Sequence, residues 1–229
     1  MIEKPAVLMR KALACYRELP LMVRFHNYVR HKTCPFDRIE PWVPQEGMIY
    51  DLGCGHGLFS IYLALSSRTR RIVGSDSSED KIAAAILASH TISNVEFRQA
   101  NILNLPMEMC DAVIILDVLY LMNHEQQEKI IERCRKHLRP GGLLIVTTTD
   151  TRPRWKYLWA YFQELLAVRL FRITTGYGLC FRPGGEFTSL FAKIGFEAHS
   201  EKIDRGYVYP HLLFICKKKI DVGVMGQKV

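Results

Sequence analysis

The sequence predicts an α/β protein with a doubly wound, mostly parallel sheet of seven strands that is covered by helices on both faces. Between residues 48 and 148, short β-prone runs alternate with segments of helical apolar periodicity. A glycine-rich turn at residues 53–57 joins the first of these strands to the first helix. The chain has 229 residues, of which 48% are hydrophobic, so it can form one such domain with an appended element but is short for two.

An N-terminal helical cap and its connection to the domain are expected over residues 1–46. Apolar residues recur there among arginines and lysines, which is typical of one or two amphipathic helices, and Pro20 interrupts the pattern. A proline-bearing connection at 34–44 then leads to the first strand. We therefore expect the main domain to span residues 47–219.

The elements of the domain follow in order. Each expected strand is a β-prone run bounded by turn residues, and the first five lie at 48–51, 71–75, 95–98, 112–116 and 143–148. Helices are expected where apolar residues recur at helical spacing, at 58–66, 78–89 and 124–138. Asn123 and Gln126 suit a capping box for the third helix, and Pro140-Gly141-Gly142 is expected to form the turn that ends it. Such alternation is typical of a parallel sheet with right-handed crossovers.

An inserted helical segment, about residues 151–184, is expected after the fifth strand. Its stretch 154–172 is apolar on more than one side and predicts a helix. A last helix at 185–194 and two strands, at about 197–203 and 211–217, complete the domain. Residues 220–229 are expected to form a flexible tail.

The turn after the first strand carries the strongest functional signal. Asp51 ends the strand, and Gly53, Gly55 and Gly57 follow at alternate positions, unlike the G-x-G-x-x-G of dinucleotide-binding folds. Glycine lets a ligand approach the backbone, and the helix start that follows offers unpaired N–H groups. With this pattern, residues 48–150 resemble the class I S-adenosylmethionine-dependent methyltransferases. The resemblance implies that S-adenosyl-L-methionine is the cofactor, S-adenosyl-L-homocysteine its product, and that Asp51, Cys54 and the three glycines hold its methionine part.

A second acid marks the ribose site. Asp76 closes the second strand about 25 residues after Asp51, near the spacing at which α/β nucleotide sites place a carboxylate on ribose hydroxyls. In the resembled family this position binds both hydroxyls of the adenosine ribose, and we expect Asp76 to do so, with Ser77 beside it. Asp76 could also cap the helix that follows.

The end of the third strand departs from the resembled family. The family has glycine and aspartate there, whereas this chain has Ala100 and Asn101. An asparagine accepts a hydrogen bond through its carbonyl oxygen but carries no charge. We expect Asn101 and the backbone of Ile102 to contact the adenine.

The fourth strand predicts the reaction site. Its apolar run indicates a central strand buried on both faces, so Asp117 emerges at the carboxyl end, where open α/β sheets bind ligands. In the resembled family this loop lines the methyl-transfer site, so Asp117 and Tyr120 are the predicted catalytic residues, and Asp117 also faces the cofactor. A general base is needed only if the acceptor must lose a proton. Further candidates for that role are His124, Tyr157, Tyr207, Tyr209 and His211.

The acceptor is expected to be a small or lipid-like molecule, apolar and anionic. No Asn/Asp-Pro-Pro-Tyr/Phe run follows the fourth strand and no Pro-Cys supplies a thiolate for base methylation, so a nucleic-acid substrate is disfavoured. The net charge of +8 is concentrated in residues 1–40 and 133–172. Aromatic residues beside Arg152, Arg154 and Lys156 would suit an apolar acceptor with an anionic group, under a roof formed with the cap. The same basic segments could instead be solvated helix faces, or contact a membrane surface or a carrier protein.

Other interpretations remain open. A non-catalytic S-adenosylmethionine-binding or scaffolding protein would keep the same motifs, and an RNA-directed methyltransferase would use the basic segments. The seven cysteines are scattered without a C-x-x-C pair, so we expect no metal site and no disulfide framework. The N-terminus has no signal-peptide layout and the longest apolar run is well short of a membrane span, which favours a cytoplasmic location.

Overall fold

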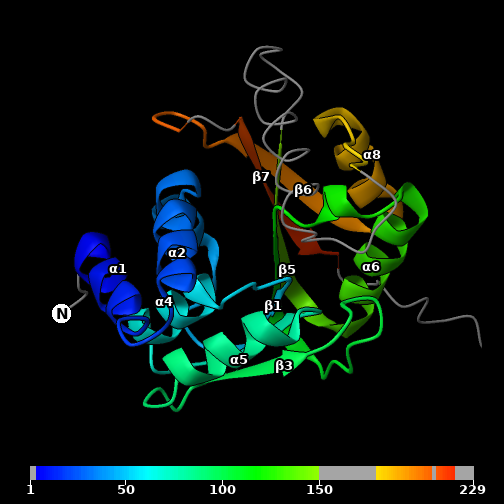
Figure 1. Cartoon of the computed structure of the whole chain (residues 1–229). Helices are drawn as coiled ribbons and strands as arrows, with labels where there is room; N and C mark the ends of the chain where they lie inside the picture. The colour runs from blue at the N-terminus through cyan, green and yellow to red at the C-terminus, as the bar shows by residue number, and fades with distance from the viewer. Residues whose placement is uncertain (1–3, 150–178, 208–209, 220–229) are drawn as a thin grey trace, which may run out of the picture.

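Seven strands form one sheet in the order β3-β2-β1-β4-β5-β7-β6 in the computed structural model, which describes residues 4–149, 179–207 and 210–219 (Figure 1). The strands are β1 (Gly47–Leu52), β2 (Arg70–Asp76), β3 (Val95–Gln99), β4 (Cys110–Leu116), β5 (Leu138–Thr149), β6 (Phe196–Lys202) and β7 (His211–Lys218). Neighbours run parallel except at β7, which is antiparallel to β5 and to β6. The chain order reverses between β1 and β4, so the ligand crevice of a doubly wound sheet falls at their carboxyl ends. The predicted fold class is confirmed.

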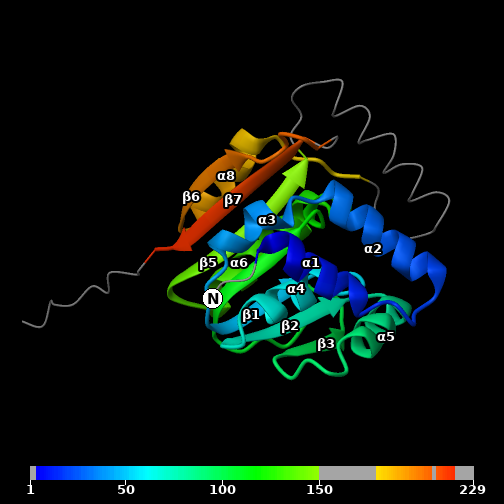
Figure 2. The same ribbon diagram turned by 90° about the vertical axis from the view of Figure 1, so that its left-hand side faces the viewer.

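Helices cover both faces of this sheet (Figure 2). Apolar side chains of α1 (Pro5–Ala14), α3 (Phe36–Ile39), α4 (Leu58–Ser66) and α5 (Glu79–Ala88) form one layer, and those of α6 (His124–His137) and α8 (Gly184–Ile194) form the other. Along β4, Ile114 and Leu116 join the first layer and Val113 and Ile115 the second, as predicted for a strand buried on both faces. The remaining elements are α2 (Leu21–Thr33) and the 3-10 turns η1 (Glu40–Trp42) and η2 (Leu119–Leu121). Within the described ranges, no helix has both the length and the apolar character needed to cross a bilayer.

The start of β5 differs from the sequence prediction. Leu138 already pairs with Cys110, and the register then shifts so that Leu143 pairs with Ala112. The four residues between them, which include the expected Pro-Gly-Gly turn, are taken up as an irregularity within the strand rather than as a separate turn. The predicted start of the strand was wrong because Leu138 already pairs with Cys110 before these four residues, and pairing resumes at Leu143 after them. The predicted inserted helix at 154–172 and the tail at 220–229 lie outside the described residues.

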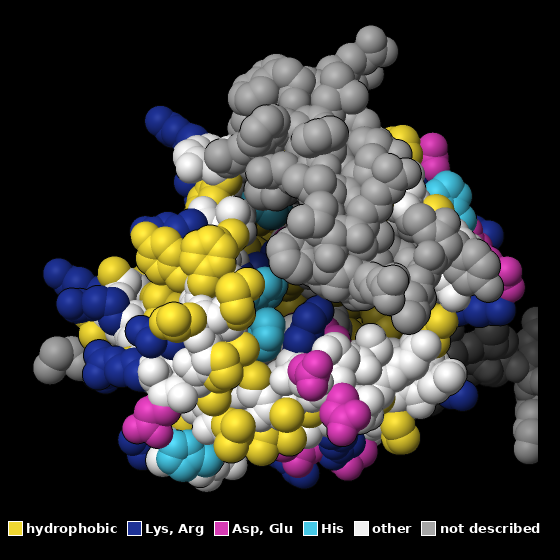
Figure 3. Space-filling view, viewed as in Figure 1, with side chains coloured by type: hydrophobic (Ala, Val, Ile, Leu, Met, Phe, Trp, Pro, Cys, Tyr) yellow, Lys and Arg dark blue, Asp and Glu magenta, His cyan; other side chains and the backbone are white. Residues whose placement is uncertain are grey.

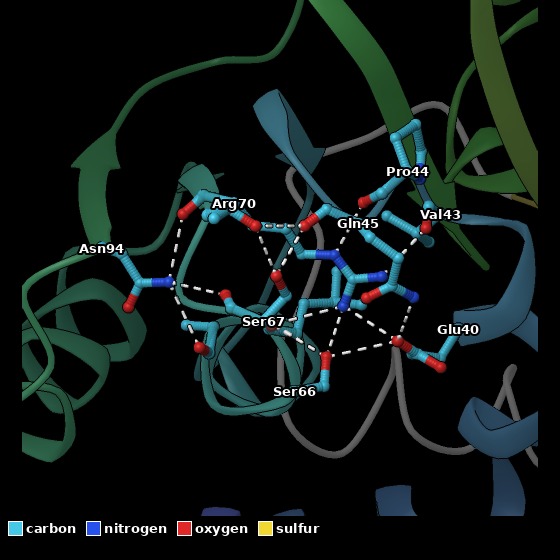
Figure 4. Close-up of polar contacts among 11 residues, drawn as sticks. Glu40, Val43, Pro44, Gln45, Ser66, Ser67, Arg70 and Asn94 are labelled. Atoms are coloured by element: carbon cyan, nitrogen blue, oxygen red, sulfur yellow. Dashed lines mark hydrogen bonds and ion pairs between the residues drawn. The ribbon is translucent and has the colours of Figure 1, made fainter. Parts of the chain in front are cut away.

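The segment that joins the cap to β1 is fixed by a buried arginine (Figure 4). Arg70, which is 1% exposed, donates to the carbonyl oxygens of Pro44 (2.7 Å) and Val43 (2.9 Å). It also donates to Ser66 and pairs with Glu40 at 2.9 Å. Burial lowers the pKa of Arg70, and this full set of acceptors offsets the loss of water around the guanidinium. The connection is thereby tied to the end of α4 and the start of β2.

The cap consists of α1 and α2, which differ in how they contact the domain. Helix α1 buries Leu8, Met9 and Ala12 in the apolar layer that contains α4. Helix α2 buries only Asn27, although it is the longer of the two. Val23 of α2 packs against the same layer while only partly buried, and the polar contacts of α2 lie at the edge of the sheet where the predicted site residues gather.

Candidate active site

The glycine-rich turn connects β1 to α4 and is tied to the end of β2. The backbone N–H groups of Gly53 and Cys54 donate to the carbonyl oxygen of Ser75 at 2.7 and 2.9 Å. The N–H of Gly55 donates to Asp76 Oδ2 at 3.0 Å. The structure therefore places the glycine-rich turn that follows Asp51 next to Asp76 at the end of β2.

The three glycines of this turn meet different surroundings. All have positive φ, but an added Cβ would lie 2.5 Å from the Val118 side chain at Gly53 and 2.5 Å from the Phe97 ring at Gly57. Those two glycines are required by packing within the protein. At Gly55 a Cβ would meet no atom of the described residues within 4 Å. Gly55 thus borders open space at the carboxyl edge of the sheet, which a ligand can enter and a side chain would fill.

The two acids of the turn have different environments. Asp51 is 3% exposed and accepts a hydrogen bond of 2.5 Å from the Ser60 hydroxyl. Burial raises the pKa of Asp51 to about 6, because the buried carboxylate has lost its water. A cationic group of a ligand beside Asp51 would favour the charged carboxylate and be stabilised by it. Asp76 is half-buried and accepts from the N–H groups of Gly55 and Ser78, each at 3.0 Å. A carboxylate oxygen has two acceptor positions, so Asp76 can still receive hydroxyl donors.

Three further predicted cofactor residues lie on the adjoining loops. Ser77 is exposed next to Asp76, while Ser78 is the residue that caps α5. Asn101 is exposed, and its side-chain oxygen accepts from the N–H of Leu103 at 2.9 Å, which closes a local turn. Ile102 is buried. Asn101, which stands where the resembled family has an aspartate, therefore stabilises the turn that follows β3.

Asp117 lies at the centre of a buried charged cluster at the end of β4. Its Oδ2 pairs with Arg30 of α2 at 2.8 Å, and its Oδ1 accepts from the Thr147 hydroxyl of β5 at 3.0 Å. His211 of β7 donates from Nε2 to the carbonyl oxygen of Thr33 at 2.6 Å and turns Nδ1 toward Asp117 Oδ1 at 3.6 Å. Burial alone would raise the pKa of Asp117, but Arg30 and His211 hold that pKa well below its usual range. The carboxylate is therefore a permanent anion and a weak base.

Tyr120 is held on the loop that follows. It is 6% exposed, its ring stacks on Phe181 with centroids 4.9 Å apart, and its carbonyl oxygen accepts from the N–H of Cys180 at 2.7 Å. The fully buried Gln127 amide donates to the carbonyl oxygens of Leu119, Met122 and Cys180 at 2.9–3.1 Å. This amide fixes the position of the loop relative to the chain that returns from residue 179.

The other candidate bases are not gathered at one point. His124 is exposed at the start of α6. Tyr207 donates to Asp37 at 3.5 Å and packs edge-on against His211, with ring centroids 6.2 Å apart. His211 belongs to the Asp117 cluster. Tyr157 and Tyr209 lie outside the described residues, as do Arg152, Arg154 and Lys156.

The cap reaches the glycine-rich turn directly, which the sequence did not predict at the level of residues. The Tyr16 hydroxyl donates to the carbonyl oxygen of His56 at 2.6 Å, and the Nδ1 atoms of His26 and His56 are 3.1 Å apart. Burial first, and then nearby positive groups, lower the pKa of each of these histidines to about 4. A signal was present: His26, Arg30 and Thr33 recur at helical spacing and form one polar face of α2.

Comparisons with known proteins agree with this geometry. Residues 49–142 match the methyltransferase domain family. The ubiquinone biosynthesis O-methyltransferase of Pseudomonas syringae pv. tomato is 30% identical over 116 residues, which cover 49% of this chain and 48% of that protein. The carboxy-S-adenosyl-L-methionine synthase of Actinobacillus succinogenes is 28% identical over 113 residues, 47% of each chain. The chain thus spans about half the length of the curated relatives it matches.

Solved structures share the fold across most of the chain. Magnesium protoporphyrin IX methyltransferase from Synechocystis PCC 6803, solved with bound SAH, has a TM-score of 0.66 at 18% identity and covers 94% of this chain and 96% of that one. An O-methyltransferase family protein from Burkholderia thailandensis has a TM-score of 0.65 at 17% identity, over 87% of this chain and 58% of that one. Residues 49–142 therefore form a methyltransferase domain, and with the glycine-rich turn, the two strand-end acids and the seven-stranded sheet the chain resembles the class I S-adenosylmethionine-dependent methyltransferases.

Proposed function

We propose that this protein transfers a methyl group from S-adenosyl-L-methionine to a small or lipid-like acceptor that is apolar and anionic. The observation that carries the proposal is Gly55, the glycine of the turn at which an added Cβ meets none of the residues that the structure describes. The other two glycines of the turn are explained by packing against Val118 and Phe97. The open space at Gly55 is best explained as the place where a ligand binds. When bound, the cofactor supplies a methyl group already activated by its sulfonium.

The cofactor would be held at the ends of β1, β2 and β3. Asp76 would bind the ribose hydroxyls, with Ser77 beside it. Asp51 would stabilise the positive charge of the methionine part, because burial disfavours its carboxylate in the absence of a cation. Gly53, Cys54, Gly55 and Gly57 would lie beneath the same part, and Asn101 and Ile102 beside the adenine.

Asp117 and Tyr120 would border the acceptor. The carboxylate of Asp117 is held by Arg30 and Thr147, so we assign it a fixed negative charge near the reacting groups rather than the role of proton acceptor. Tyr120 would contact the acceptor through its ring edge or hydroxyl. Closure of the cap over this edge would exclude water while the methyl group moves.

A small-molecule acceptor is supported by relatives named as biosynthetic O-methyltransferases. The excess of arginine and lysine in residues 1–40 supports an anionic group on it. A cytoplasmic location stays a prediction of the sequence. A non-catalytic cofactor-binding protein and an RNA-directed methyltransferase are the alternatives, and neither has a specific structural observation in its favour.

The proposal is tested by following methyl-labelled S-adenosylmethionine into a small-molecule extract. The intact protein should pass label into an organic-soluble product, which mass spectrometry then identifies. Gly55→Val should lose both this transfer and the binding of S-adenosylhomocysteine, because the branched side chain fills the open space. Gly206→Val is the matched control, since Gly206 also has positive φ and open surroundings, but lies far along the chain between β6 and β7. Cofactor binding without label transfer to any small molecule or RNA would favour the non-catalytic alternative.

A second experiment addresses the ribose assignment. Asp76→Ala should weaken binding of S-adenosylhomocysteine about tenfold or more, since hydrogen bonds to a carboxylate contribute roughly 1.5–3 kcal/mol. Calorimetry measures this, and Asp80→Ala, at an exposed position in the first turn of α5, is the control. Equal affinity for the wild type and Asp76→Ala would show that another group binds the ribose.

A further inference from the structure

Helix α2 exposes its apolar face to solvent. Leu21, Met22, Phe25, Tyr28 and Val29 are 75, 66, 62, 53 and 40% exposed, and we call these five residues the outer face of α2. Their spacing of three, four, seven and eight residues places them on one side of the helix. Figure 3 shows hydrophobic side chains gathered over α2, with lysine and arginine side chains along the adjoining side over α1. An exposed patch of this size on one helix marks an interaction surface.

The side of α2 that meets the protein is mostly polar instead, with Val23 as its apolar contact to the core. Arg30 pairs with Asp117, His26 meets His56, and Asn27 is the one residue of the helix that is buried. A helix that only covered a core would be turned the other way, with Phe25 and Leu21 inward. The outer face therefore has no role in the fold of the described residues.

The charge around this face is strongly positive. Residues 4–33 contain seven lysines and arginines and a single acid, Glu18. Arg24 and Lys32 are exposed on α2 itself, and Arg17 is exposed on the turn before it. A second copy of the chain would bring the same positive charge to the interface, so charge favours an anionic partner over self-association.

A groove runs between α1 and α2 beside the outer face. It has a volume of 390 Å³, and Arg17 and Arg24 line it together with Phe25, Tyr28 and Asn27. The Asn27 side chain is 2% exposed, yet its amide nitrogen finds no hydrogen-bond acceptor in the structure of the described chain. The amide nitrogen is itself inaccessible to solvent, so the groove presents its arginine and aromatic side chains to a ligand rather than this donor.

We propose that the outer face of α2 docks onto the surface of an anionic phospholipid bilayer. The five apolar side chains enter the boundary between headgroups and acyl chains, while Arg17, Arg24 and Lys32 contact lipid phosphates. His26 and Arg30 on the opposite side of the helix contact His56 and Asp117 of the candidate active site. Docking would therefore place the side of the site that we expect to bind the acceptor next to the membrane. This inference goes beyond the proposed methyl transfer and does not require it.

Vesicle flotation of the full chain without cofactor tests the proposal. The wild type should float with vesicles of phosphatidylcholine and phosphatidylglycerol in equal parts, and not with phosphatidylcholine alone. Phe25→Gln should weaken this binding about tenfold, since it removes one large apolar side chain from the interface. Arg24→Gln should weaken it about fivefold and reduce its dependence on salt.

Matched controls separate this surface from general effects. Leu87→Gln on α5 changes an apolar residue that is 60% exposed, close to the 62% of Phe25, and should bind vesicles as the wild type does. Phe25→Gln should keep wild-type affinity for S-adenosylhomocysteine and a wild-type melting temperature, so a failure of docking is distinct from a failure of the cofactor site. Three results would overturn the proposal: no flotation with anionic vesicles, equal losses for Phe25→Gln and Leu87→Gln, or a dimer in sedimentation velocity that Phe25→Gln dissociates.

Discussion

Helices α1 and α2 are neighbours in the cap but are attached to the domain by opposite kinds of contact. Helix α1 buries Leu8, Met9 and Ala12, so non-directional apolar burial holds it. Helix α2 exposes most of its apolar residues, packs only Val23 against the core, and is otherwise attached through the Arg30 ion pair and the contact of His26 with the glycine-rich turn. Polar contacts depend on charge, protonation and geometry, whereas apolar burial does not. We therefore expect α1 to behave as part of the core and α2 to respond to what the active site binds.

Truncation of an apolar residue in each helix should give the largest difference. Leu8→Ala should lower the free energy of unfolding by about 2–4 kcal/mol, because Leu8 is 5% exposed and its loss leaves a cavity. Leu21→Ala, at a position that is 75% exposed, should change it by less than about 0.5 kcal/mol. Chemical denaturation measures both. Equal losses would mean that α2 is packed against the protein as α1 is.

Removal of the Arg30 charge should have a smaller effect on stability. Arg30→Met leaves the buried Asp117 carboxylate without its ion-pair partner, which we expect to cost about 2–3 kcal/mol, less than for a fully buried pair because Arg30 is 30% exposed. Since the pKa of Asp117 is depressed, this stabilisation is complete above about pH 4 and is lost as the pH falls further. The difference in the free energy of unfolding between wild type and Arg30→Met, measured by denaturation, should therefore become smaller as the pH falls below about 4.

Arg24→Met on the same helix is the control for that experiment, because Arg24 is exposed and has the same side-chain length. A gap that stays constant down to the lowest pH at which the protein folds would show that the guanidinium acts through packing and not through its charge.

The histidine contact should give the smallest effect, seen as a dependence on pH. The pKa values of His26 and His56 are lowered to about 4, so the folded protein favours their neutral forms. Their contribution to stability is complete above about pH 6.5 and is lost as the pH falls toward 4. Asp51 acts in the opposite direction because its pKa is raised, but it is common to wild type and variant and cancels in the comparison.

His26→Gln should therefore lose less stability than the wild type between pH 7 and pH 5, as measured by urea unfolding at each pH. His90→Gln, at an exposed histidine that follows α5, should behave as the wild type. A wild-type pH profile for His26→Gln would mean that the two imidazoles do not interact in solution.

The sheet could be predicted from the sequence because its signals are local. Alternation of β-prone and helical runs fixed the order of the elements, and the bounds expected for α4, 58–66, agree with the structure. Asp51, Gly55 and Asp76 could be assigned together because strand ends and turns follow one another at short range. The start of β5 was missed because Leu138 pairs with Cys110 ahead of the unpaired Pro140-Gly141-Gly142, and the local sequence does not indicate that long-range pair.

The cluster around Asp117 could be predicted only in part. Its position at the end of a buried strand indicated a site residue. Its partner Arg30 lies 87 residues earlier in the chain, and neither residue's local pattern indicates the other. The same holds for the contact between His26 and His56, 30 residues apart. The sequence predicts solvated or ligand-binding roles for the charges in the cap, whereas one of them, Arg30, pairs with Asp117 at the candidate active site.

The backbone of Asp117 has a consequence for how this position can vary during evolution. Its φ is +58°, a value that glycine, asparagine and aspartate tolerate and that other side chains resist. The positive charge of Arg30 demands a carboxylate, which only aspartate and glutamate supply. Aspartate alone meets both demands. Among homologues, we expect aspartate here wherever a basic residue occupies the position of Arg30, and a joint change to glycine or asparagine where that base is lost.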